Sequence, residues 1–391
     1  MSYLAALPEA SVGGTATLEQ LRDRLAGPLP QEQHDPAKVI ERLVHDVEGG
    51  LQGSTGGRFF GWVIGGTVPA ALAADWLTST WDQNAGMFSV APAAAVVEEV
   101  CGQWLLELLE LPRTASFALV TGCQMAHVTC LAAARNAVLA KHGWDVEQQG
   151  LFGAPRIRVV TGDQHHGTID RALRILGMGR DSIIEIPVDE NGQLRADALE
   201  PVLAAHSEAP TILLLQAGDL NTGSFDPFEE LIPLAHKMGA WVHVDGAFGL
   251  WAAVSPEHRH FTQGVDREAH YRSLGHHANY LTHSDVARDQ VDWNPEYSRR
   301  ARGFATYAAI ASLGRDGISQ IVADCCHHAH TIVSQAGTLT GVTILHVPHI
   351  NQGLLRFLDP KPGATEADHD QHTEKITARI VASGEALFAC T

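Results

Sequence analysis

The sequence has few positive charges, few cysteines and no long apolar run. Its 27 lysines and arginines stand against 45 acidic residues, giving a formal net charge of −18. A chain this anionic lacks the positive patch that displaces counterions from nucleic acid or an acidic membrane surface, so neither is expected as a partner. No apolar stretch approaches the roughly 20 residues of a membrane-spanning helix, and Met1 to Glu9 lacks the basic start of a secretory signal. We therefore expect neither export nor a membrane anchor.

The cysteines do not indicate a disulfide framework or a zinc site. They include no C-x-x-C pair, so we interpret them as thiols in a reducing compartment and expect a cytoplasmic protein without a metal. The run CCHHAH at 325–330 places Cys326 and His330 four residues apart on one helix face. No second ligand pair lies at zinc spacing, so we interpret this run as a polar helix face.

Length and composition predict a folded protein with more than one part. The chain has 391 residues, of which 45% are hydrophobic and 18% charged, which is typical of a globular protein with a large core. We expect an N-terminal helical segment with a Gly-rich loop at 1–66, a large α/β domain at 67–292 and a small α+β domain at 293–391. The apolar residues 387–391 are typical of the start of another strand, so we expect the small domain to be incomplete.

Apolar runs and helical patterns alternate through the central part. We expect a pair of amphipathic helices between 17 and 47, and further helices at 69–81, 91–111, 125–139, 168–176, 196–205 and 228–238. Strands are expected at 117–121, 157–160, 183–186, 212–215 and 241–244. This alternation predicts a mostly parallel sheet with helices on both faces. Two helices at 298–313 and 318–334, two strands at 342–347 and 353–358, and a surface loop at 360–372 should follow.

The most informative motif is WVHVDGAFG at 241–249, an apolar strand that ends in Asp245. In open parallel sheets, ligands bind beyond the carboxyl ends of the strands, so we expect Asp245 to face a cleft. A carboxylate there can keep a heteroaromatic nitrogen protonated, which pyridoxal phosphate needs to draw in electrons. The alternative, that Asp245 caps the next turn, remains open on this motif alone.

Three more strand ends carry polar side chains. In TGCQMAH at 121–127, the start of a helix and Gln124 are suited to a phosphate. In DQHHGT at 163–168, an imidazole could stack on a ring and act as an acid. In LNTGSFD at 220–226, the Thr222 hydroxyl could reach a ring oxygen or Asp245. Each motif alone has a structural alternative: a turn that binds nothing, a structural histidine and a capped loop.

Together these four motifs resemble the fold type I, group II decarboxylases that use pyridoxal phosphate and act on aromatic amino acids, glutamate and related substrates. Flanking segments at 58–69, 81–84 and 298–304 also resemble that family. The resemblance implies a fold type I large domain, pyridoxal 5'-phosphate, a homodimer and α-decarboxylation of an L-amino acid to an amine. It also assigns roles: Cys123 and Gln124 at the phosphate, His166 stacked on the ring as the catalytic residue, Thr222 near the ring, and Asp245 at the pyridine nitrogen.

The chain departs from this family after the aspartate loop. There the family has a strand, an H-K pair with the Schiff-base lysine and another strand, whereas here Gly264–Asp266 runs directly into 267–271. No lysine lies between Lys237 and Lys361, although this amine normally holds the cofactor and displaces product. The segment 283–293 also lacks the tyrosine that animal aromatic decarboxylases use to protonate the intermediate.

Three hypotheses follow from the sequence. The first is a decarboxylase that is active by an unusual route or represented by an incomplete chain. The second is a decarboxylase-like protein that binds cofactor without a covalent bond, or that serves only as a dimerising or interaction module. The third is an unrelated two-domain α/β enzyme whose motifs match by chance.

Overall fold

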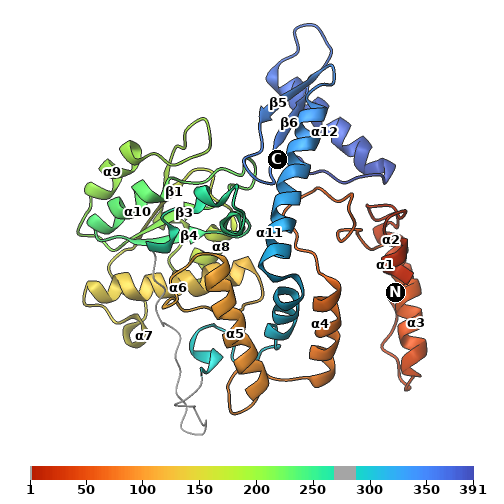
Figure 1. The fold of residues 1–391 in the computed structure, drawn as a ribbon, viewed down its shortest axis with the longest axis horizontal. Coiled ribbons are helices and arrows are strands. Elements are labelled where there is room, and N and C mark those ends of the chain that lie inside the picture. Colours follow the sequence, from red (N-terminus) through yellow and green to blue (C-terminus); the bar gives the residue numbers. More distant parts are fainter. Residues whose placement is uncertain (1, 268–287) are drawn as a thin grey trace. The chain divides into compact units, whose positions relative to one another are not determined.

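The computed structural model describes residues 2–267 and 288–391 (Figure 1). These residues form two compact units. The larger holds Val68–Ala336 and Ile344–Leu354, and the smaller holds Met1–Thr67, Gly337–Thr343 and Leu355–Thr391. The three-part division expected from the sequence therefore stays a prediction. None of the described helices has both the length and the apolar character needed to cross a membrane.

Four parallel strands form the centre of the larger unit. They are β1 (Arg158–Gly162), β2 (Ile183–Ile186), β3 (Thr211–Gln216) and β4 (Trp241–Asp245), in the order β2-β1-β3-β4. Each lies where an apolar run predicted it. In the register of β3 and β4, Gln216 pairs with Asp245, so these two strands end side by side.

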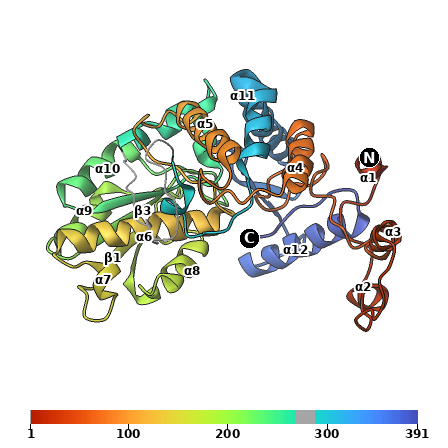
Figure 2. The same ribbon diagram turned by 90° about the horizontal axis from the view of Figure 1, so that it is seen from below.

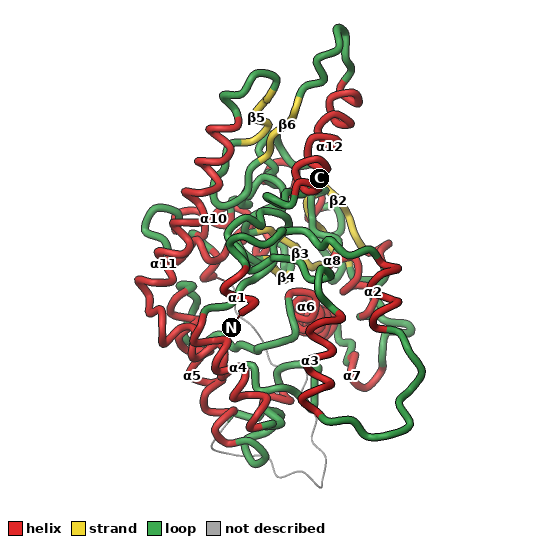
Figure 3. Tube along the Cα trace, turned by 90° about the vertical axis from the view of Figure 1, so that its right-hand side faces the viewer, coloured by secondary structure: helices red, strands yellow, loops and turns green. Residues whose placement is uncertain are grey.

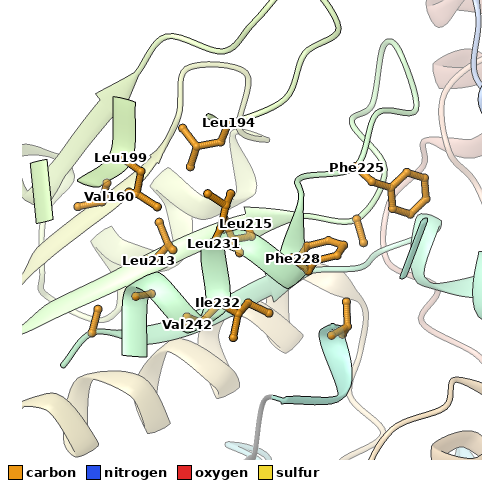
Figure 4. Close-up of a cluster of buried hydrophobic side chains, with 14 of the residues drawn as sticks. Val160, Leu194, Leu199, Leu213, Leu215, Phe225, Phe228, Leu231, Ile232 and Val242 are labelled. Atoms are coloured by element: carbon orange, nitrogen blue, oxygen red, sulfur yellow. The ribbon is translucent and has the colours of Figure 1, made fainter. Parts of the chain in front are cut away.

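Helices cover both faces of this sheet (Figure 2). Residues Ile212 and Leu214 of β3 pack in a cluster with α6 (Cys123–Lys141) and α8 (Thr168–Ile175). The alternate residues, Leu213 and Leu215, pack with α9 (Ala196–Ala204) and α10 (Phe228–Lys237) (Figure 4). Successive strand residues point to opposite faces, which explains why β3 is apolar throughout. The expected fold class, a parallel sheet with helices on both faces, is confirmed.

The larger unit also contains α4 (Pro69–Trp81), α5 (Pro92–Leu108), α7 (Val146–Gln149) and α11 (Gly303–Ala336). Within α11, Gly314 has φ 63° and ψ −179°, so two helices meet there, close to the expected break.

The strand expected at 117–121 is wrong, because these residues are not paired in the described sheet. The carbonyl oxygens of Phe117 and Leu119 accept hydrogen bonds from the Arg288 and Arg299 guanidinium groups instead. An apolar run becomes a strand only where a neighbouring strand satisfies its backbone.

The smaller unit is mainly helical, with long loops (Figure 3). It contains α1 (Ser2–Ala6), α2 (Leu18–Leu25), α3 (Pro36–Asp46) and α12 (Glu366–Ser383). A reciprocal capping box of Thr17 and Gln20 starts α2. The Arg58 guanidinium donates to the carbonyl oxygens of Ala10 and Glu385, which ties the first and last parts of this unit together.

The C-terminal segment departs from expectation in two places. The loop expected at 360–372 ends early, because Thr365 and Asp368 form a second capping box that starts α12. Residue Leu387, where a strand was expected to begin, makes a single parallel bridge with Phe59. The two strands expected before this segment are present as β5 (Val342–His346) and β6 (Leu354–Phe357), which pair with each other.

Candidate active site

The loops that follow β1, β3 and β4 lie at one edge of the sheet, because neighbouring parallel strands end on the same side. The start of α6 joins this edge through two side chains. Gln124 Nε2 donates to the carbonyl oxygen of Thr168, in α8, at 3.2 Å, and His127 contacts Asp245 at the end of β4. Four residues predicted from the sequence, Cys123, Gln124, His166 and Asp245, therefore belong to connected elements.

Two donors hold the carboxylate of Asp245. The backbone N–H of Ala247 donates to Oδ1 at 3.2 Å, and His127 Nε2 lies 3.4 Å from Oδ2. Burial by itself raises the pKa of this carboxyl group, but the hydrogen bond from His127 and the electrostatic influence of His127 and His243 lower it further than burial raises it. The net pKa is below the ordinary aspartate value, so Asp245 is an anion at neutral pH. This is the form that can stabilise a protonated ring nitrogen.

Two buried histidines lie behind this carboxylate. His127 Nδ1 is 3.1 Å from His243 Nε2, and the two residues are 4% and 9% exposed. Neither histidine was predicted from the sequence to have a role. The sequence does contain a pattern that points to both histidines. His243 and Asp245 are two residues apart in a strand and so share a face of the sheet. His127 lies one helical turn after Cys123 on α6.

The start of α6 can accommodate an anion. Gly122 precedes the helix with φ 139°, and in the described part of the chain no side chain caps this helix. A Cβ atom on Gly122 would meet no atom within 4 Å, so the space before the helix is open. Backbone N–H groups and the helix dipole at such an end favour a phosphate. The open turn and the anionic carboxylate fit the two ends of pyridoxal phosphate.

The thiol of Cys123 lies on the first turn of α6. Burial raises its pKa, and the negative charge of Asp245 raises it further. The thiol is therefore neutral at physiological pH, and it adds no negative charge to the space expected to hold a phosphate.

His166 lies between β1 and α8 with a defined tautomer. The backbone N–H of Thr168 donates to its Nδ1 at 3.3 Å, and Thr168 Oγ1 is 2.7 Å from the same nitrogen. An amide N–H can only donate, so Nδ1 accepts and Nε2 carries the proton of the neutral ring. His166 is exposed, whereas the neighbouring His165 has a buried side chain that contacts Gly162 O and Asp170. Of the two, His166 is the one suited to meet a bound molecule.

Thr222 is engaged within its own loop. Its hydroxyl lies 2.9 Å from Asp219 Oδ1 and 2.9 Å from Ser224 Oγ. This is the capped loop that the sequence left open as an alternative, and the approach of Thr222 to a cofactor ring stays a prediction.

The lysines of the larger unit lie away from Asp245. Lys237 is exposed at the end of α10, before β4 begins. Lys141 is the last of the 19 residues of α6, about 27 Å along the helix from Cys123. The other lysines, Lys38, Lys361 and Lys375, belong to the smaller unit. Residues 268–287 lie outside the described part. They include most of the segment 267–271, which follows the aspartate loop, and the first half of the segment 283–293, where a tyrosine was noted as missing. None of residues 268–287 is a lysine.

Residues 2–267 and 288–391 contain no group of three His, Cys, Asp or Glu side chains that could hold a metal ion. Within the run at 325–330, Cys326 is buried on α11 and Cys325 is exposed.

A conserved domain identifies the family of this chain. The conserved domain of pyridoxal-dependent decarboxylases matches residues 19–276. The chain belongs to the pyridoxal-dependent decarboxylase family. The predicted cofactor, pyridoxal 5'-phosphate (PLP), and the predicted assignment to the PLP-dependent amino-acid decarboxylases are confirmed.

Two curated relatives of this decarboxylase-family chain have moderate identity. L-2,4-diaminobutyrate decarboxylase of Rhizobium meliloti (strain 1021) is 26% identical over 356 residues, which are 83% of this chain and 69% of the relative. Aromatic-L-amino-acid decarboxylase of Bacillus atrophaeus is 27% identical over 270 residues, which are 68% of this chain. The second match spans 53% of that relative, about half its length.

Solved structures share the fold of this family member. Oryza sativa TDC, solved with PLP and tryptamine, superposes with a TM-score of 0.91 at 21% identity, covering 100% of this chain and 88% of that chain. Mouse CSAD in apo form gives 0.86 at 20% identity, covering 96% of this chain and 86% of that chain. At this level of identity, the likeness establishes the fold.

Proposed function

We propose that this chain decarboxylates an L-amino acid with PLP that it holds without a covalent bond to lysine. One observation carries the proposal: the anionic carboxylate of Asp245, fixed by His127 and Ala247 at the end of β4. A decarboxylase needs such an anion at the ring nitrogen. Family membership supplies the reaction class, and the positions of Lys141 and Lys237, the two lysines of the larger unit, support non-covalent retention.

PLP, when bound, supplies the positive ring that accepts the electron pair left behind as carbon dioxide departs. Asp245 would stabilise the proton on the ring nitrogen through its fixed negative charge. The first N–H groups of α6 and the side-chain amide of Gln124 would bind the phosphate. His166, when it carries a proton on both ring nitrogens, would donate to Thr168 Oγ1 through Nδ1 and would give its Nε2 proton to the substrate α-carbon after carbon dioxide has left, which returns its ring to the neutral form. In this scheme Cys123 and Thr222 border the cofactor without moving a proton.

We also propose that the protein is a homodimer and is located in the cytoplasm. Helix α3 exposes Val39, Ile40, Leu43 and Val44, each between 48% and 66% exposed. An exposed apolar stripe of this kind is typical of an interaction surface, which supports a homodimer. All six cysteines are present as thiols, which supports the cytoplasm as the compartment. Light scattering on the purified chain measures the assembly, and a mass of one chain would contradict the dimer.

The proposed reaction is tested on the purified chain with PLP and a panel of L-amino acids. We expect carbon dioxide release that requires PLP, together with recovery of PLP by dialysis. After borohydride reduction, peptide mass mapping should find no pyridoxyl-lysine. An adduct on any lysine would overturn non-covalent retention. PLP binding without carbon dioxide release from any amino acid would overturn the decarboxylase and favour a binding module.

A further inference from the structure

A hydrogen-bonded series of polar groups runs from the buried His243 and His127 to the half-buried Asp245. His243 Nε2 lies 3.1 Å from His127 Nδ1, and His127 Nε2 lies 3.4 Å from Asp245 Oδ2. The side chains of His127 and Asp245 are only 5% and 14% exposed. These contacts join strand β4 to helix α6 entirely within the larger unit.

The donors and acceptors of these groups determine which nitrogen donates in each hydrogen bond. The anionic carboxylate of Asp245 can only accept, so His127 Nε2 must carry a proton. When the His127 ring is neutral, its Nδ1 accepts, and His243 Nε2 must then be the donor. Both protons therefore point toward Asp245. If His127 takes up a second proton, its Nδ1 becomes a donor and the middle bond reverses, so His243 must change its tautomer.

The contacts also orient the carboxylate. Ala247 N–H holds Oδ1 and His127 holds Oδ2, which fixes the plane of the group. Each oxygen keeps acceptor capacity for one more donor. A ring N–H arriving at this carboxylate would meet an acceptor that is already charged and aligned, so little rearrangement is needed on binding.

We propose that His127 is a positioning residue that holds Asp245 charged and aligned for the PLP ring nitrogen, and that His243 in turn holds His127. This inference rests on the proposed role of Asp245 at the cofactor. It assigns a function to two residues that contact neither substrate nor cofactor in the proposed scheme. The residue pair acts through Asp245, so its loss should weaken cofactor binding without removing the site.

Three substitutions isolate this role. His127→Phe removes both ring nitrogens, His127→Gln restores a donor near the position of Nε2, and His243→Asn removes the support behind His127. His142→Gln is the matched control, because His142 directly follows the same helix and its ring nitrogens lie 2.7 and 2.9 Å from the carbonyl oxygens of Val138 and Glu208. Circular dichroism shows which variants fold. If His127→Phe does not fold, the two single variants His127→Gln and His243→Asn carry the test.

The first readout needs no cofactor. Proton NMR of the free protein should show downfield, exchange-protected imidazole N–H signals for two hydrogen bonds, the one between His243 and His127 and the one between His127 and Asp245. Both should vanish in His127→Phe, and the signal of the bond between the two histidines should vanish in His243→Asn. His142→Gln should keep both. Absence of these signals from the unsubstituted protein would overturn the proposal.

The second readout is the PLP dissociation constant from tryptophan fluorescence. His127→Phe should weaken binding about 10- to 100-fold, the range of one lost hydrogen bond to a charged group. His127→Gln should recover most of that loss, and His142→Gln should bind like the unsubstituted protein. Unchanged affinity in both His127 variants would overturn the positioning role while leaving the proposed function in place. Failure of the unsubstituted protein to bind PLP would overturn both.

Discussion

His127 Nε2 lies 3.4 Å from Asp245 Oδ2, and this contact links the start of α6 to the end of β4. The first of these elements is suited to a phosphate, and the second carries the carboxylate suited to a ring nitrogen. This contact therefore joins the two ends of the proposed cofactor site. The geometry depends on packed secondary structure, which holds side chains more accurately than loops do.

A buried ion pair should contribute strongly to the stability of the larger unit. The side chains of Glu98 and Arg299 are both 0% exposed, and two nitrogens lie 2.6 and 3.0 Å from the two carboxylate oxygens. Replacing Glu98 by Leu leaves the guanidinium buried without its counter-charge. The free energy of unfolding in urea should therefore fall by about 3–5 kcal/mol.

An exposed pair in the same unit is the control for this measurement. Arg315 pairs with Glu107 at 3.0 Å, and the two side chains are 46% and 55% exposed. Because solvent screens this pair, Arg315→Ala should cost less than about 1 kcal/mol. Equal losses for Glu98→Leu and Arg315→Ala would show that burial of the first pair has no special effect.

The loop after β4 should tolerate no side chain at Gly249. A Cβ atom there would overlap the carbonyl oxygen of Ala217, at the end of β3. Since backbone must move to make room, Gly249→Ala should lower the free energy of unfolding by about 1–3 kcal/mol. Gly167 is the control, because a Cβ there would meet no atom within 4 Å and its φ is −59°. Thermal unfolding should rank Gly167→Ala at or slightly above the unsubstituted protein.

Asp226 should make stability fall as pH rises. Burial raises its pKa to about 6, although the N–H groups of Leu194 and Gln216 donate to it. In the unfolded chain its pKa is about 3.9. The contribution of Asp226 to the free energy of unfolding is therefore complete below about pH 4. It is lost as pH rises through 6, which lowers the free energy of unfolding by about 3 kcal/mol.

Comparison with Asp226→Asn isolates that change. The difference in free energy of unfolding between the unsubstituted protein and Asp226→Asn should fall between pH 4 and 7. Asp245→Asn should behave differently, because the lowered pKa of Asp245 gives a contribution that is present above about pH 4 and is lost only as pH falls further. A difference that stays constant for Asp226→Asn over this range would contradict the assignment.

His166 should affect turnover more than cofactor affinity. Gln at this position can donate a hydrogen bond but cannot give up a proton at neutral pH. His166→Gln should therefore slow carbon dioxide release about 10²- to 10⁴-fold. His206→Gln, at an exposed histidine, should leave the rate unchanged. A variant of His166 with full activity would show that another group protonates the substrate.

The sequence predicted the elements whose signal is local. Strands β1 to β4 follow from apolar runs, and Asp245 follows from its place at a strand end. The failed strand at 117–121 has the same apolar signal, but strand formation also needs a partner, which the segment itself does not encode. In the described structure, arginine side chains bind its carbonyl groups instead.

The sequence predicted which residues lie at the candidate site better than it predicted which side chains contact one another there. His127 and His243 are distant in sequence, and their contact depends on how α6 packs against β4. Only the strand period hinted that His243 shares a face with Asp245. Thr222 shows the converse, because its place after a strand suggested a ligand contact, while its hydroxyl lies within hydrogen-bond distance of its own loop.

Asp245 and the start of α6 are proposed to hold the two ends of PLP, and a crystal structure of the chain grown with PLP would locate both ends. We expect the ring nitrogen at about 2.7–3.2 Å from a carboxylate oxygen of Asp245, with the phosphate at the N–H groups of Cys123 and Gln124 and no bond to a lysine. PLP bound elsewhere, or joined to a lysine, would contradict it.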